Sequence, residues 1–111
     1  MCIFCKIISG EIPSTKLYED DKMIIIKDIN PQAPIHYLMI PKTHFSEISE
    51  MTESDARLLG ECYLTLGTLK DSLGLTDGYR LIVNCGTNGC QTVPHLHVHI
   101  LGGVKLTEKM L

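Results

Sequence analysis

The strongest constraint in this sequence is the alternation of histidine and aliphatic residues over His95-Leu96-His97-Val98-His99-Ile100-Leu101. Side chains in a β-strand point alternately to opposite faces, so the three histidines would share one face at intervals of about 6.6 Å. The aliphatic residues would then face the other way, into a core. The segment therefore predicts a half-buried strand whose histidine face carries chemistry.

Three imidazoles on one face permit three interpretations. The first is a solvated surface that happens to contain histidine, which the repetition makes the least favoured. The second is a metal site, because neutral imidazole is a common metal ligand. The third makes the middle residue, His97, a nucleophile toward phosphorus, with its neighbours setting its tautomer and handling protons.

Length and charge narrow the remaining possibilities. A chain of 111 residues with 44% hydrophobic and 21% charged side chains fits one globular domain with one core. A net charge of -3 offers no basic surface, so no nucleic-acid partner is expected. Apolar runs such as Met23–Ile26 are too short to span a membrane, and Met1–Gly10 does not read as a signal peptide.

The five cysteines point to a reducing compartment, and we expect the cytoplasm. An odd count without a signal peptide argues against a disulfide framework. Cys2 and Cys5 form a Cys-x-x-Cys pair, a spacing common in zinc sites that take two more ligands from elsewhere. The alternative is a reduced pair near the terminus. Cys62 lies on a predicted helix stripe and is expected in the core, whereas Cys85 and Cys90 receive no chemical role.

Proline and glycine divide the chain into short strands and one long helix. Leucines at three- and four-residue spacings predict a helix over Thr52–Leu73, with a capping box at Thr52 and Asp55 and a stop at Gly74. One or two helical turns are expected in Cys2–Ser9. This order indicates an α+β layer in which a helix covers one face of an antiparallel sheet. The expected strands are Leu17–Glu19, Met23–Lys27, Ile35–Ile40, Tyr79–Asn84 and His95–Leu101.

A glycine-rich loop, Asn84-Cys85-Gly86-Thr87-Asn88-Gly89-Cys90-Gln91-Thr92, precedes the histidine segment. Glycines let main-chain N–H groups approach and converge on an anion, and Asn84, Gln91 and Thr92 add polar side chains. By itself such a loop is usually only a connection. Beside three histidines, it predicts a phosphate-binding loop.

The His-x-His-x-His-apolar-apolar pattern resembles the signature of the histidine-triad (HIT) nucleotide-binding family, Hint branch, of the bacterial type with an N-terminal Cys-x-x-Cys. The resemblance implies an α+β, HIT-like fold with a five-stranded antiparallel sheet and one long helix, paired in a homodimer into a ten-stranded sheet. Residues 1–111 would form a single HIT domain with a variable C-terminal tail at 104–111. The other matching segments are Ile3–Ile8, Glu11–Pro13, Asp28–Pro34, His36–Leu38, Ile40–Lys42 with His44, Gly78–Arg80 and Leu101–Gly103.

The resemblance also implies hydrolysis at the α-phosphate of a nucleotide conjugate through a nucleotidyl-histidine intermediate. His97 matches the nucleophile, and His99 matches the histidine that contacts the phosphate and the leaving group. Thr92 stands where the branch usually has serine, and His36 has a supporting catalytic role. Cys90 and Pro94 depart from the usual pattern, in which a small and an aromatic residue stand. The remaining phosphate-holding positions match Asn84, Cys90 and Gln91.

For the nucleoside, the resemblance assigns Asp28 to the ribose hydroxyls, since a carboxylate can accept hydrogen bonds from a vicinal diol. An alternative for Asp28 is a turn residue before Asn30-Pro31, and both roles can coexist. An apolar slot for a purine base is implied as well, although its residues could equally be core. That slot matches Ile3, Phe4, Ile7, Ile26 and Ile29.

A structural zinc is also implied, and no organic cofactor is expected. By resemblance, Cys2 and Cys5 would share the ion with His44 and His95. This site would tie the N-terminal segment to the histidine segment. Without zinc, His95 would instead form a hydrogen bond with His36.

Three functions remain open. The leading one is a purine nucleoside 5'-phosphoramidate hydrolase, similar to an adenosine 5'-monophosphoramidase. The second is a dinucleoside polyphosphate hydrolase of the Fhit-like branch, and the third is a nucleotide-binding or scaffold protein with incidental catalysis. Ser9–Pro13 and Leu101–Gly103 favour the Hint branch over the second. The tail, residues 104–111, lacks the aromatic residue and the prolines of eukaryotic Hint proteins, so the leaving group is not predicted.

Overall fold

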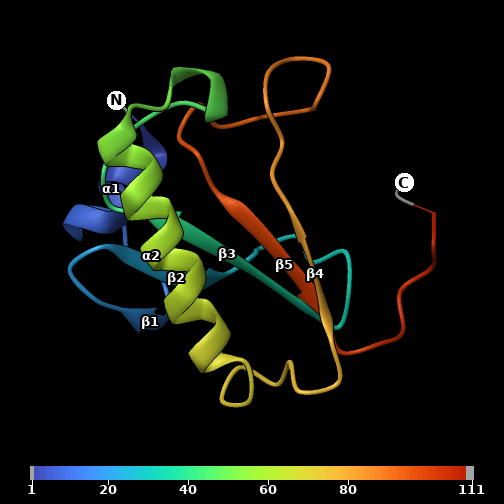
Figure 1. Cartoon of the computed structure of the whole chain (residues 1–111). Helices are drawn as coiled ribbons and strands as arrows, with labels where there is room; N and C mark the ends of the chain where they lie inside the picture. The colour runs from blue at the N-terminus through green and yellow to red at the C-terminus, as the bar shows by residue number, and fades with distance from the viewer. Residues whose placement is uncertain (1, 110–111) are drawn as a thin grey trace.

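A computed structural model describes residues 2–109 as a five-stranded antiparallel sheet between two helices of unequal length (Figure 1). The strand order is β1-β2-β3-β5-β4, and each neighbouring pair is antiparallel. The α+β class and the five-stranded sheet are thereby confirmed. Met1, Met110 and Leu111 lie outside the described residues, so the end of the predicted tail does too. The elements are α1 (Ile3–Ser9), β1 (Lys16–Glu19), β2 (Met23–Lys27), β3 (Ile35–Pro41), a 3-10 helix (Ile48–Glu50), α2 (Glu53–Leu69), β4 (Tyr79–Ile82) and β5 (Val98–Gly102).

The two faces of the sheet are covered by different helices. Met23 and Ile25 of β2 belong to a buried cluster with α2, whereas Ile24 and Ile26 belong to a second cluster with Phe4 and Ile7 of α1. Burial on both faces explains why β2 reads as a continuous apolar run. The predicted helix layer is therefore correct for one face, while the short α1 covers part of the other (Figure 1). Among the residues described, no helix is both long and apolar enough to cross a membrane.

The long helix starts as predicted and ends earlier. Thr52 and Asp55 form the expected capping box. The regular helix ends at Leu69, and the chain then makes one further turn. That turn closes where the stop was predicted: Gly74 has a φ of 78°, its N–H bonds to the carbonyl of Asp71, and the Leu75 N–H bonds to that of Lys70. This pair of hydrogen bonds is a Schellman motif, in which glycine is favoured at the position of Gly74.

The histidine strand is shorter than its sequence pattern suggests. β5 begins at Val98, so His95 and His97 precede the strand. The neighbouring strand β3 ends at Pro41, which has no N–H to continue the ladder, and its carbonyl is bonded by the His95 ring instead. The aliphatic side chains of residues 95–101 nevertheless share one face, because Leu96, Val98 and Ile100 all lie in the buried cluster under α2.

Candidate functional site

A hollow of about 390 Å³ opens on the face of the sheet that α1 only partly covers. One part of its wall is aliphatic and aromatic, and another carries histidine, a carboxylate and a hydroxyl. A larger hollow of about 680 Å³ near Gly74 and Lys105 contains no histidine or cysteine among its described lining residues. Chemistry rather than size therefore identifies the candidate site. The predicted residues that line the smaller hollow are Ile3, Phe4, Ile7, Ile26, Asp28, Ile29, Thr92, His97 and His99.

His97 has one ring nitrogen free for chemistry. The residue is buried, and its Nδ1 lies 2.8 Å from the carbonyl oxygen of His95. A carbonyl can only accept, so Nδ1 carries the proton and donates it. In the neutral ring, Nε2 therefore keeps its lone pair. The edge-on packing of Phe4, with ring centroids 4.9 Å apart, holds the orientation of the imidazole.

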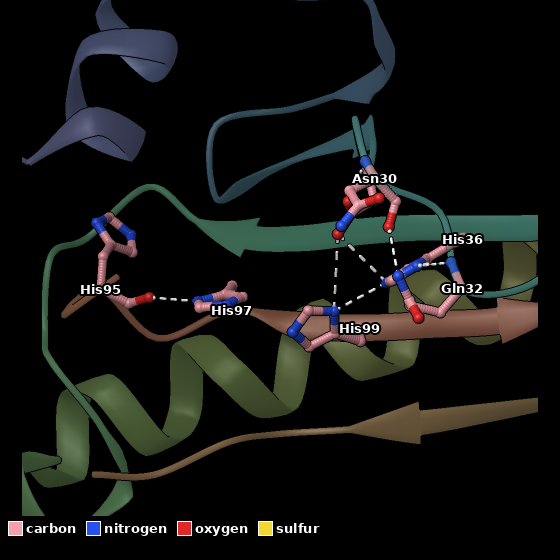
Figure 2. Close-up of polar contacts among 7 residues, drawn as sticks. Asn30, Gln32, His36, His95, His97 and His99 are labelled. Atoms are coloured by element: carbon pink, nitrogen blue, oxygen red, sulfur yellow. Dashed lines mark hydrogen bonds and ion pairs between the residues drawn. The ribbon is translucent and has the colours of Figure 1, made fainter. Parts of the chain in front are cut away.

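His99, His36 and Asp28 form a second polar group. Figure 2 shows His36 and His99 of this group, with His99 beside His97. Nδ1 of His99 lies 2.9 Å from Nε2 of His36, and Oδ2 of Asp28 lies 3.3 Å from that same Nε2. Burial lowers the pKa of His99, with smaller contributions of the same sign from His97 and His36 and an opposing one from Asp28. Near neutral pH, His99 is therefore uncharged.

The predicted phosphate loop reaches the hollow only at its end. Thr92 lines the hollow, whereas Asn84, Cys90 and Gln91 are not among its lining residues. The Gln91 side chain instead holds the loop together, accepting from the N–H of Gly86 and donating to main-chain carbonyls. The main-chain N–H groups of Cys90 and Gln91 also bond within the loop. The expected convergence of these N–H groups on an anion is therefore absent from this loop conformation.

Close packing explains one glycine of this loop, Gly89. A Cβ added at Gly89 would lie 2.5 Å from the carbonyl oxygen of Cys85, so only glycine fits there. The structure also places Ile12, Ser14 and Lys27 in the wall of the hollow, which the sequence patterns did not predict. Ile12 belongs to a matching motif, Glu11-Ile12-Pro13, but Ser14 and Lys27 carry no comparable signal.

Cys2, Cys5, His44 and His95 converge as a metal site would. Cys5 Sγ lies 3.3 Å from His44 Nδ1 and 3.6 Å from His95 Nδ1, and the two nitrogens lie 3.1 Å apart. Cys2 Sγ lies 3.5 Å from His95 Nδ1. Tetrahedral zinc at ordinary bond lengths separates sulfur from nitrogen by about 3.6 Å and nitrogen from nitrogen by about 3.3 Å. These four separations are close to those of a zinc tetrahedron, and all four ligand atoms lie within 4.8 Å of one another.

The protonation state of this group also suits a metal. Nε2 of His95 lies 2.8 Å from the Pro41 carbonyl oxygen, so Nε2 carries the proton and Nδ1 directs its lone pair at the cluster. Burial lowers the pKa of His95 and so favours this neutral form. Burial and the neighbouring Cys2 raise the pKa of the Cys5 thiol, so metal binding would release a proton there.

One predicted contact, between His95 and His36, is not formed in the structure. His95 was expected to bond to His36 if zinc were not bound. In the structure His95 bonds to Pro41, and His36 bonds to His99. The two histidines therefore belong to separate clusters, His95 with Cys2 and Cys5 and His36 with His99.

Comparisons with known proteins agree with this geometry. Residues 1–110 match the family model described as scavenger mRNA decapping enzyme C-term binding. The chain is 47% identical over 103 residues to a 14 kDa zinc-binding protein of Zea mays, covering 91% of this chain and 80% of that protein. A HIT family hydrolase from Clostridium thermocellum superposes with a TM-score of 0.92 at 50% identity, over 99% of this chain and 96% of that one. A histidine triad nucleotide-binding protein from Candida albicans gives a TM-score of 0.80 at 34% identity, over 98% and 85%.

Proposed function

This chain belongs to the histidine-triad (HIT) family, and we propose that it is a hydrolase acting at the α-phosphate of purine nucleotide conjugates, nucleoside 5'-phosphoramidates above all. The observation that carries the proposal is the lone pair on Nε2 of His97. It stands at the wall of a hollow whose other groups are His99, Asp28 and an apolar surface. His97 would supply the nucleophile, His99 would contact the phosphate, Asp28 would contact the ribose and the apolar surface would contact the base.

The proposed reaction has two steps. Nε2 of His97 attacks the α-phosphorus, and the bond from phosphorus to the leaving nitrogen breaks as that nitrogen takes up a proton from solvent water. His97 then carries the nucleotide as a phosphorus–nitrogen adduct, with Nδ1 still bonded to the His95 carbonyl. Water attacks the adduct, the phosphorus–nitrogen bond breaks, and the nucleoside monophosphate leaves. Division into two displacements lowers each barrier.

His99 and Thr92 would contact the phosphate and the leaving group, since both line the hollow beside His97. His36 supports His99 through their hydrogen bond. We retain Asn84, Cys90 and Gln91 as proposed phosphate contacts. For Cys90 and Gln91, main-chain contacts would require the loop to open, because their N–H groups are engaged inside it.

The nucleoside would occupy the apolar part of the hollow. Asp28 lines it with a half-buried carboxylate that accepts from the Asn30 N–H at 2.8 Å. Each carboxylate oxygen can accept more than one hydrogen bond, so Asp28 can serve its turn and a ribose diol together. The base would lie against the proposed slot of Ile3, Phe4, Ile7, Ile26 and Ile29.

We also propose a structural zinc held by Cys2, Cys5, His44 and His95. The near-tetrahedral spacing of the four ligand atoms supports it. When bound, the ion would supply a cross-link between α1 and the segment before β5. His95 would then be anchored at its ring, and its carbonyl would hold Nδ1 of His97. The cysteines ligate only when reduced, which favours the cytoplasm.

A homodimer is proposed with the enzyme. β4 is an edge strand of the sheet, and its Tyr79 and Leu81 are exposed apolar residues. Edge pairing with a second copy would continue the sheet and cover these side chains. Light scattering at several protein concentrations measures this directly: a monomeric mass throughout would contradict the dimer.

The function is tested by His97→Ala. We expect turnover of an adenosine phosphoramidate to fall by more than about 10³-fold, while nucleoside monophosphate binding is retained. Parallel assays with a dinucleoside polyphosphate distinguish a phosphoramidate hydrolase from the second candidate, a dinucleoside polyphosphate hydrolase. Binding of nucleotide by the wild type without turnover of either substrate would favour the scaffold function. Full activity in the variant would exclude His97 as nucleophile.

A further inference from the structure

The loop that leads into β3 is held by three hydrogen bonds from main-chain N–H groups, one of which ends on the imidazole of His36. The Asp28 N–H donates to the His36 carbonyl at 3.0 Å, and the Asn30 N–H donates to Oδ1 of Asp28 at 2.8 Å. The main-chain N–H of Gln32 donates to Nδ1 of His36 at 3.0 Å (Figure 2). The ring of His36 is therefore an acceptor on its Nδ1 side.

This contact determines where the proton of His36 resides. An amide N–H can only donate, so Nδ1 must present a lone pair. Neutral His36 consequently carries its single proton on Nε2, the nitrogen that faces His99 and Asp28.

The position of the proton on His99 follows from that on His36. Nε2 of His36 lies 2.9 Å from Nδ1 of His99, closer than the 3.3 Å to Oδ2 of Asp28. Donation from His36 occupies the lone pair of Nδ1, so neutral His99 carries its proton on Nε2. Figure 2 shows that second nitrogen on the side of the ring toward His97, whose ring centroid lies 5.1 Å away.

We propose that the main-chain N–H of Gln32 sets the tautomers of His36 and His99, so that His99 presents a neutral Nε2–H to a bound phosphate. That the bound group is a phosphate rests on the function proposed above. Gln32 and His36 are then positioning residues, and His99 is the group that touches substrate. His97 and His99 hold opposite tautomers: the first offers a lone pair at Nε2, and the second offers a donor there.

The arrangement has a chemical purpose. A nucleophile and a hydrogen-bond donor that stand side by side can act on one phosphate group, the donor on an oxygen that gains charge. A donor already directed at that oxygen needs no reorganisation during the reaction. With the other tautomer, a lone pair of His99 would face the phosphate and repel it. Lowering of the pKa of His99 by burial is consistent with a neutral donor.

The tautomers can be measured without substrate. Protein labelled with ¹⁵N-histidine, at a pH slightly above neutral, reports the protonation of each ring nitrogen through long-range proton–nitrogen correlations. We expect Nε2–H forms for His36 and His99 and an Nδ1–H form for His97. An Nδ1–H form for His36, or a charged His99 at that pH, would overturn the proposal.

Gln32→Pro removes the N–H and is the direct variant. We expect loss of the single Nε2–H signature at His36 and His99 and a fall in kcat of about 10²-fold with little change in nucleotide affinity. Gln32→Ala is its matched control, because it keeps the N–H and loses only the side chain, so it should keep the wild-type tautomers. An unchanged spectrum in a folded Gln32→Pro variant would refute the role of the N–H.

If Gln32→Pro does not fold, the ¹⁵N spectrum of the wild type still tests the tautomer of His36, and substitutions at His36 test the step from His36 to His99. The amide nitrogen of glutamine can stand near the position of Nε2 and donate to Nδ1 of His99, whereas leucine cannot. We expect His36→Gln to preserve the Nε2–H form of His99 and most of kcat, and His36→Leu to lose both. Equal behaviour of the two would contradict the proposal. Correct tautomers in a protein without phosphoramidase activity would instead refute the proposed function alone.

Discussion

His95 and His36 are both buried imidazoles with one ring nitrogen directed into a cluster of possible ligands. They differ in the main-chain group on the other nitrogen. The Pro41 carbonyl accepts from His95, which leaves a lone pair facing the cluster of Cys2, Cys5 and His44. The Gln32 N–H donates to His36, which leaves a proton facing its cluster.

This difference distinguishes the two clusters by the group that each buried ring presents to its neighbours. Across residues 2–109, both groups bring their ligand atoms close enough together for a metal ion. A metal needs lone pairs, and only the cluster of His95 offers one from its buried ring in the observed hydrogen bonding. In the cluster of Asp28, His36 and His99, a proton already occupies the position a metal would take. The direction of one outer hydrogen bond thus favours zinc in one cluster and proton positioning in the other.

The largest effect is expected from a variant that lacks two of the four proposed zinc ligands. A Cys2→Ser/Cys5→Ser double variant should lose stoichiometric zinc and several kcal/mol of unfolding free energy, because a structural zinc contributes directly to folding. Metal analysis of protein prepared without chelator, together with thermal unfolding, measures both. Cys90→Ser, at an exposed position, is the matched control and should change neither. Zinc retained by the double variant, or lost on His36→Leu, would reverse the assignment of the two clusters.

The next prediction concerns the side chain that packs against His95 and His97. The ring of Phe4 contacts His95 and His97 edge-on at centroid distances of 5.9 and 4.9 Å, and it is 7% exposed. Phe4→Ala should lower the unfolding free energy by about 3 to 4 kcal/mol in chemical denaturation, because it opens a cavity beside both rings. Leu64→Ala, at a residue 74% exposed on α2, should cost less than about 0.5 kcal/mol. Similar losses for the two variants would argue that α1 does not support the site.

A smaller effect tests whether the two clusters act independently of each other. Asp28→Asn should weaken nucleoside monophosphate binding by about tenfold, since the neutral amide is a poorer acceptor for the ribose hydroxyls and for His36. Zinc content should not change. Calorimetric titration and metal analysis make the comparison, with Asp21→Asn as control, because the Asp21 side chain is 87% exposed. Unchanged affinity in Asp28→Asn would remove Asp28 from the nucleotide site.

The smallest effect is on the pH dependence of stability. The folded-state pKa of His99 lies below its ordinary value of 6.5, chiefly because of burial. The unfolded state therefore binds a proton first, and stability should fall as the pH drops from neutral through 6.5 toward the lowered pKa. His99→Gln should show a shallower fall between pH 7 and 5 in denaturant unfolding, with wild type at the same zinc content for comparison. Equal slopes would mean that His99 contributes nothing to this dependence.

Much of the architecture could be predicted from local patterns. The capping box at Thr52, the glycine stop at Gly74 and the buried run Met23–Ile26 depend on neighbouring residues, and the structure agrees with them. The start of β5 could not be predicted, because it depends on Pro41, a residue on another strand. The loop 84–92 was expected to present its N–H groups, but hydrogen bonds within the loop and to Ser46 use several of its polar groups.

By itself, the sequence determined which chemical groups this protein has and roughly where each lies. The alternation in residues 95–101 directs the histidines opposite to the aliphatic residues, and the Cys-x-x-Cys pair has a spacing that is common in zinc sites. Only the tertiary structure decided which ring nitrogens carry protons. That depends on a carbonyl at Pro41 and an N–H at Gln32. Both belong to the main chain, which is the same for every sequence, so only the folded positions of these groups could reveal them.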